Sequence, residues 1–198
     1  MTNDKPEPIK PTGRRYRSGT RRLTRLTKQL AATAHHEAGH AVISRKLRFK
    51  IKQVTIVPKG DAAGSVTWLK ALGVSYNSGI TGESIGRHHD RVVALLAGVE
   101  AQRRFKPQSI RSYQTTCDYS AAVDFLLSLH GEEKERNCAS KYLQARTRNL
   151  VSNPVNWRFI QDLAKALLER QTLTGKEVEN VLQASERAQK EERRARTK

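Results

Sequence analysis

The sequence predicts a mainly helical, single-domain protein with one small β-sheet. Apolar residues recur at helical spacing over most of the chain, as on the buried faces of amphipathic helices. Two short runs rich in β-branched residues are the exception and are typical of strands. The length of 198 residues allows one domain with a core, but not two full-sized domains.

The first predicted helix runs from about Arg22 to Phe49, where leucines and alanines are spaced three and four apart. The runs QVTIVP (53–58) and GSVTWL (64–69) flank the turn-forming KGDAA and predict a hairpin. Either the first run offers an edge to which an extended peptide could pair, or the hairpin is purely structural. The glycine-rich stretch 73–86 is expected to be flexible.

The rest of the chain is predicted to be helical. A second helix contains RVVALLAGVEAQRRF and ends near Pro107. A capping box of Thr174 and Glu177 marks the start of the last helix. The three helices between are expected from Asp118 to Gly131, from about Glu132 to Val151, and from Trp157 to Arg170.

Basic residues are concentrated at the two ends of a chain whose net charge is +18. We therefore expect a basic, disordered tail over residues 1–20, one folded domain over 21–184, and a second basic tail over 185–198. These tails could bind nucleic acid or an anionic membrane surface, or could simply keep a basic protein soluble.

No stretch is long and apolar enough to span a bilayer, and the N-terminus lacks the apolar region of a signal peptide. Two cysteines are too few for a disulfide framework. We expect a cytoplasmic protein with no transmembrane segment. The chain also has no phosphate-binding loop, which argues against an ATPase of its own.

The first predicted helix contains His36-Glu37-Ala38-Gly39-His40, the HExxH pattern. Histidines four apart lie on one helical face and can bind one zinc ion, while the intervening Glu lies beside the ion. Such a Glu can take a proton from a zinc-activated water, so the pattern predicts peptide hydrolysis. The alternative is a pair of core histidines satisfied by carbonyls or carboxylates. Gly39 is unfavourable within a helix, and its presence is easier to explain if another element approaches the helix closely at this position.

Five blocks resemble, in order, the peptidase domain of the FtsH family of membrane-anchored AAA+ zinc proteases, over about residues 34 to 182. The blocks are AHHEAGHAVIS, VTIVPKGDAAGSVTW, VVALLAGVEAQRRF, TTCDYSAAV and NWRFIQDLAKALLERQTLTGKEVENVL. The resemblance implies a single FtsH-peptidase-like domain. It also implies that His36, His40 and Asp118 are the zinc ligands and that Glu37 is the catalytic base.

Asp118 has a rationale of its own, because a carboxylate that opens a helix is favoured by the helix dipole. It could instead be an ordinary N-cap. Asp124 and Cys117 are competing third ligands, but Asp124 lies further along the helix and a thiolate is not the expected ligand type. Neither His35 nor the run His88-His89-Asp90 is assigned a second metal site.

One block of the chain differs from the family pattern. The chain has GVEAQ where the family has GRAAE, so Gln102 replaces a Glu and Val99 replaces an Arg. Groups behind the metal ligands tune affinity and rate, and these exchanges are expected to alter them. The sequence thus predicts a zinc endopeptidase acting on unfolded or short peptides, with a separate ATPase or a homo-oligomer as partner. The alternative is a weak or inactive peptidase-like scaffold that binds nucleic acid or a partner through the basic tails.

Overall fold

The computed structural model describes residues 16–69, 82–110 and 112–196. Within them the fold is 78% helical, with six α-helices and a three-stranded antiparallel sheet. The sequence predicted this fold class, mainly helical with one small sheet. Among these helices, none combines the length and the apolarity needed to span a bilayer. Residues 1–15 of the predicted N-terminal tail and residues 73–81 of the glycine-rich stretch lie outside the described residues. The remaining parts, residues 16–20 and 82–86, are helical rather than disordered or flexible as expected.

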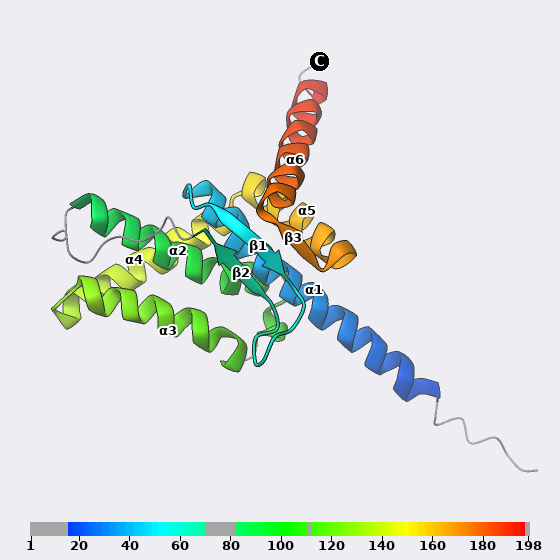
Figure 1. Ribbon diagram of the computed structural model, residues 1–198, viewed down its shortest axis with the longest axis horizontal. Helices are drawn as coiled ribbons and strands as arrows, with labels where there is room; N and C mark the ends of the chain where they lie inside the picture. Colours follow the sequence, from blue (N-terminus) through cyan, green and yellow to red (C-terminus); the bar gives the residue numbers. More distant parts are fainter. Residues whose placement is uncertain (1–15, 70–81, 111, 197–198) are drawn as a thin grey trace, which may run out of the picture.

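The C-terminal part of helix α1 (Tyr16–Lys46) lies in the middle of the molecule, with α2 (Gly82–Phe105) and α5 (Pro154–Arg170) packed against α1, whose N-terminal part projects from the bundle (Figure 1). Every residue from Ala32 to Ser44 is buried. Because this segment is buried on all sides, each of its polar side chains needs a hydrogen-bonding partner inside the protein. The HExxH histidines are therefore interior residues.

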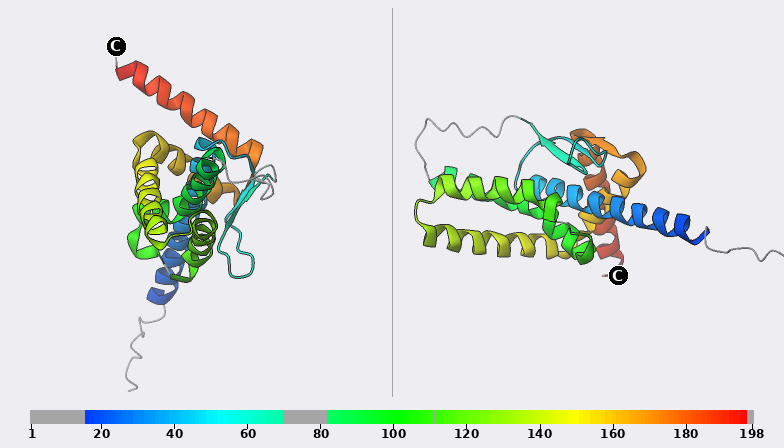
Figure 2. Two further views of the ribbon diagram at one scale, coloured as in Figure 1. Left: turned by 90° about the vertical axis from the view of Figure 1, so that its left-hand side faces the viewer. Right: turned by 90° about the horizontal axis from the view of Figure 1, so that it is seen from below.

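Three further helices complete the bundle. Helix α3 (Ser112–Leu129) packs on α2, α4 (Glu133–Ser152) packs on α2 and α3, and α6 (Gly175–Arg196) packs on α5. The sheet and α4 lie on opposite flanks of the helical core in both views of Figure 2. The basic C-terminal segment is helical to Arg196, and its division from the folded domain at residue 185 stays a prediction.

The sheet has the order β2-β1-β3, formed by β1 (Ile51–Thr55), β2 (Ser65–Trp68) and β3 (Thr172–Thr174). The predicted hairpin is β1 and β2, with Thr55 opposite Ser65. The third strand was not predicted, because three residues are too few to show a period. It pairs with β1 on its other side. Of the two alternatives for residues 53–58, the free edge is therefore wrong, because β1 is the central strand. Among the described strands, β2 and β3 are each paired on one side only.

Helix boundaries follow local chemistry. The predicted capping box is present: Thr174 N donates to Glu177 Oε2 (2.7 Å), and Glu177 N donates to Thr174 Oγ1 (3.3 Å). Helix α5 begins three residues before its predicted start, at Pro154. Asn153 Oδ1 caps it by accepting from Val155 N at 3.0 Å, and proline suits the first helical position.

Candidate metal centre

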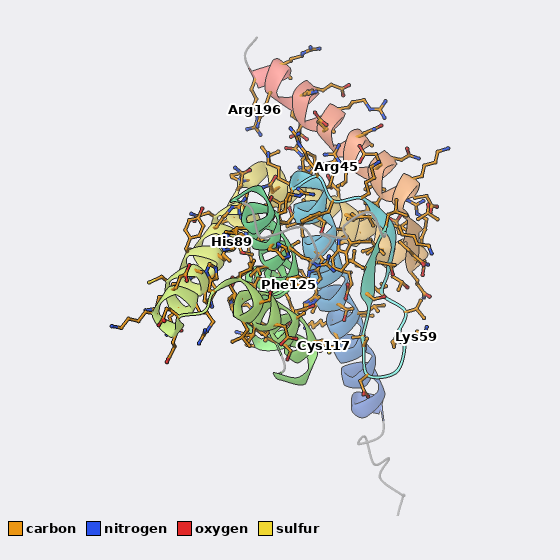
Figure 3. All side chains as sticks on the ribbon, turned by 60° about the vertical axis from the view of Figure 1, so that its left-hand side comes forward. Arg45, Lys59, His89, Cys117, Phe125 and Arg196 are labelled. Atoms are coloured by element: carbon orange, nitrogen blue, oxygen red, sulfur yellow. The ribbon has the colours of Figure 1, made fainter. Side chains whose placement is uncertain are left out.

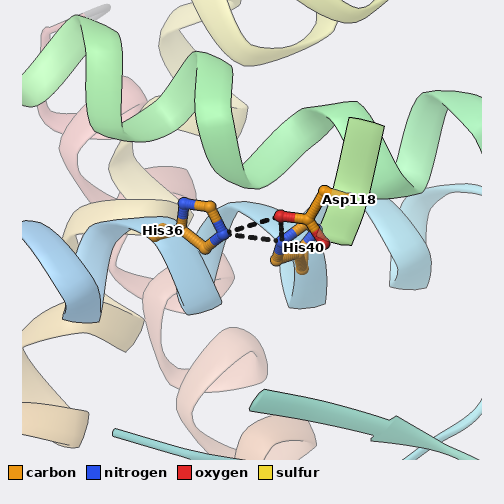
Figure 4. Close-up of side chains that lie close together, drawn as sticks. All are labelled: His36, His40 and Asp118. Carbon is orange, nitrogen blue, oxygen red and sulfur yellow. Dashed lines mark hydrogen bonds and ion pairs between the residues drawn. The ribbon is translucent and has the colours of Figure 1, made fainter. Parts of the chain in front are cut away.

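His36 and His40 project from one face of α1, one turn apart, so that their Nε2 atoms lie 3.0 Å from each other (Figure 4). Both side chains are buried. Gly39 fits the close approach expected of it: an added Cβ would lie 2.7 Å from Ala97 O on α2. The contact between α1 and α2 thus holds the two rings inside the bundle.

Asp118 reaches the two rings from α3. Its Oδ2 lies 3.0 Å from His36 Nε2 and 3.3 Å from His40 Nε2. In the part of the chain that the structure describes, these three residues are the one group of three or more His, Cys, Asp or Glu side chains with ligand atoms all within 4.8 Å. The competing ligands Asp124 and Cys117 are both exposed, and both lie outside this group.

The predicted reason for Asp118, however, is wrong. Helix α3 begins at Ser112, six residues earlier, so Asp118 neither opens nor caps it. The first five residues of the helix, SYQTT (112–116), are polar and lack apolar periodicity, so the sequence pattern did not indicate where the helix starts. Asp118 is brought to the site by the packing of α3 on α2.

The Nδ1 atom of each ring is bound to an oxygen. His40 Nδ1 donates to Ala94 O at 2.8 Å, and His36 Nδ1 donates to Gln102 Oε1 at 3.0 Å. The Gln102 amide is itself oriented, since its Nε2 donates to Ser109 O at 3.1 Å. We therefore assign protons to both Nδ1 atoms, so that Nε2, the atom that faces Asp118, is the one that can give its proton up and present a lone pair to a metal ion. This donor set fits a divalent cation.

Burial and charge act against each other on the site's ionisable groups. Burial disfavours charge on His40, yet the charge and hydrogen bond of Asp118, with the charge of Glu37, raise the pKa of His40 to about 9. Burial also disfavours the charged form of Asp118, but the charge of His40 and hydrogen bonds with both rings hold the pKa of Asp118 below its usual range. Burial raises the pKa of Glu37, against the charges of the two histidines. A carboxylate with a raised pKa is a better proton acceptor.

Two glycines leave the space that these side chains occupy. A Cβ on Gly98 of α2 would collide with the ring of His40, and a Cβ on Gly64, just before β2, would lie 2.7 Å from Glu37 Oε1. Glu37, both rings and Asp118 border one cavity of about 300 Å³. Its remaining wall includes the hairpin residues from Asp61 to Val66, Trp68, and Leu95 of α2. Gly98 and Gly64 were not predicted as site residues, because a glycine shows its role only through its spatial neighbours.

None of the other residues singled out in the sequence joins the three-residue group. His35 stacks on Phe105, with ring centroids 3.7 Å apart, and contacts Ala31 O at 2.8 Å. Trp68 Nε1 donates to Ser44 Oγ at 2.9 Å, consistent with a packing role. Val99, in place of the family's Arg, is buried on α2. Gln102, in place of the family's Glu, accepts the hydrogen bond from His36 Nδ1.

The chain is similar to curated FtsH proteins, which confirms the resemblance predicted from the motifs. It is 28% identical over 183 aligned positions to the ATP-dependent zinc metalloprotease FtsH of Neorickettsia risticii, covering 76% of this chain and 28% of that protein. It is 26% identical over 173 positions to FtsH 2 of a Thermoanaerobacter species, covering 79% and 33%. A shorter match to FtsH of Mycoplasma mobile is 46% identical over 54 positions, covering 25% and 8%. No family model matches. The chain thus spans a third or less of the length of these relatives.

Proposed function

We propose that the protein is a zinc-dependent endopeptidase. The observation that carries this proposal is the convergence of His36 Nε2, His40 Nε2 and the Asp118 carboxylate, with Glu37 bordering the same cavity. Two imidazoles and one carboxylate are a catalytic zinc ligand set, since three protein ligands leave one coordination position open. The similarity to FtsH zinc metalloproteases supports the same ion.

Each polar residue of the site has a defined task in this reaction. When bound, zinc supplies a Lewis acid for the scissile carbonyl and lowers the pKa of water to about 7. Glu37 accepts the proton of the attacking water and passes it to the leaving amine. Gln102 and the Ala94 carbonyl hold the two rings in the tautomer that presents Nε2.

The proposed substrates are unfolded segments or short peptides. Strand β2 borders the cavity and is paired on one side only among the described strands. An extended peptide could add to that side by backbone hydrogen bonds and so cross the site. Because a folded chain cannot offer such a segment, folded substrates would need a separate ATPase or a homo-oligomeric assembly to deliver them. A cytoplasmic location is part of this proposal.

Exchange of Glu37 for Gln tests the proposal directly. Glu37→Gln should retain the zinc ion bound by His36, His40 and Asp118 but lose cleavage of casein, because the amide cannot accept a proton. Exposed Glu133 on α4 provides the matched control, and Glu133→Gln should cleave casein at the wild-type rate in a chelator-sensitive manner. Full activity in Glu37→Gln, or wild-type activity that survives removal of zinc, would overturn the mechanism.

The alternative of an inactive scaffold is not favoured, because the residues needed for zinc binding and for proton transfer border one cavity. Its own test is deletion of residues 1–20. Loss of salt-sensitive nucleic-acid binding with unchanged proteolysis would place the role of that tail outside catalysis.

A further inference from the structure

A second pair of imidazoles meets at the far end of α2 and α3. His89 projects from α2 and His130 directly follows α3. Their Nε2 atoms lie 3.1 Å apart, and their rings are stacked at 27° with centroids 5.3 Å apart. Two nitrogen ligands on one tetrahedral zinc ion lie about 3.3 Å apart, given Zn–N bonds of about 2.0–2.1 Å. The separation at this second pair therefore resembles that of His36 and His40, which is 3.0 Å.

Neighbouring groups favour the tautomer of His130 and the neutral form of His89 that can bind a metal ion. His130 Nδ1 donates to Glu135 Oε1 at 2.8 Å, so its Nε2 carries the lone pair when the ring is neutral. A carboxylate behind a ligating histidine is a common support for metal binding. Burial, together with the charges of His130 and Arg146, lowers the pKa of His89 and favours its neutral, ligating form.

Two helices, α3 and α4, hold the position of His130. Its backbone N–H donates to Leu126 O at 3.1 Å, and Arg136 of α4 donates to its carbonyl at 3.0 Å. The neighbouring carboxylate of Asp90 is paired with Arg146 at 2.6 Å, which limits the positive charge that a cation would meet.

We propose that His89 and His130 form a second metal site, which takes a divalent cation that prefers imidazole ligands, such as Zn²⁺, Ni²⁺ or Cu²⁺. Water fills the remaining coordination positions. The site is distinct from the first, because His130 lies twelve residues beyond Asp118, which is about 18 Å of helix. His89 and Cys117, the residue next to Asp118, are likewise well separated in Figure 3.

The metal would join α2 to the turn between α3 and α4. Asp118 lies in the first half of α3, and His130 follows the end of that helix. An ion at the second site would therefore help to fix the helix that supplies the third ligand of the HExxH site. Binding with only two protein ligands should be weaker than binding at the three-ligand centre.

Metal titration of the chelator-stripped, full-length protein tests the proposal. With Zn²⁺ or Ni²⁺ as the probe, the wild type should bind two equivalents, the second at least about tenfold more weakly. His89→Gln and His130→Gln should each bind one equivalent, with an unchanged circular dichroism spectrum. Glu135→Gln should weaken the second equivalent by about tenfold or more.

His88, the neighbour of His89 on α2, packs against Phe125 and provides the matched control. His88→Gln should retain both equivalents, and Asp118→Asn should lose the tight one while keeping the weak one. A single equivalent in the wild type would show that His89 and His130 share only an N–H···N hydrogen bond. A second equivalent that survives in both His89→Gln and His130→Gln would equally overturn the proposal.

Discussion

Replacement of Gly98 by Ala should weaken zinc binding at the HExxH site without unfolding the protein. The added Cβ would lie 2.6 Å from Cδ2 and 2.7 Å from Cε1 of His40, whereas carbon atoms in ordinary contact are about 3.5 Å or more apart. The ring would therefore have to retreat by about 1 Å. Because Zn–N distances tolerate only about ±0.2 Å, His40 Nε2 would leave coordination distance.

The effect on folding should be small by comparison. Ala is favoured over Gly within a helix by about 1 kcal/mol, which offsets part of the overpacking cost of about 1–3 kcal/mol. Zinc affinity should fall by more than about 100-fold, and casein cleavage should fall by about 100-fold or more. Equilibrium dialysis with zinc analysis and a casein assay measure the two effects.

Gly86 on the same helix is the matched control, because it is exposed and an added Cβ would contact nothing within 4 Å. Gly86→Ala should bind zinc as the wild type does and should raise the free energy of unfolding by up to about 1 kcal/mol. Wild-type zinc affinity and activity in Gly98→Ala would refute the assigned position of the His40 ring.

Three further predictions concern the support of the site and of the fold. Gln102→Leu removes the acceptor of His36 Nδ1 and should weaken zinc binding about 10–100-fold, as a competition titration with a chromophoric chelator would measure; unchanged affinity would exclude a role in holding the ring. Thr174→Ala breaks the capping box of α6 and should lower the free energy of unfolding by about 1 kcal/mol in urea titrations; an unaltered midpoint would contradict this. The pKa of Glu179 is lowered chiefly by its hydrogen bonds from Arg45, so this pair stabilises the fold above the ordinary Glu pKa of about 4.5 and loses its effect as the pH falls through the lower folded-state value. Glu179→Gln should therefore cost up to about 1 kcal/mol at pH 7, and the difference from wild type should disappear in urea titrations at acid pH; a constant difference would argue against the ion pair.

The sequence was sufficient to predict what depends on local pattern. Helical periodicity placed the helices to within a few residues, apart from the starts of α1, α2 and α3, and the capping box of Thr174 and Glu177 marked the start of α6. The histidine pair followed from the helical repeat alone, since residues four apart must share a face. These features need no knowledge of how distant segments pack.

What the sequence could not predict depends on contacts between distant segments. Asp118 was identified through the family motif, while the reason given for it failed because the start of α3 carries no apolar pattern. The hydrogen bond between His36 and Gln102 joins residues 66 positions apart, so it forms only once α2 has packed on α1. The central position of β1 likewise follows from β3, whose three residues are far away in the chain.

The most direct test of the proposed metal centre is anomalous diffraction at the zinc edge from crystals of the zinc-loaded protein. We predict one ion within about 2.0–2.2 Å of His36 Nε2, His40 Nε2 and an Asp118 carboxylate oxygen, with Glu37 beside it but not bound to it. An ion held by the two histidines with Asp118 beyond coordination distance, or no zinc between the two rings, would contradict the proposal.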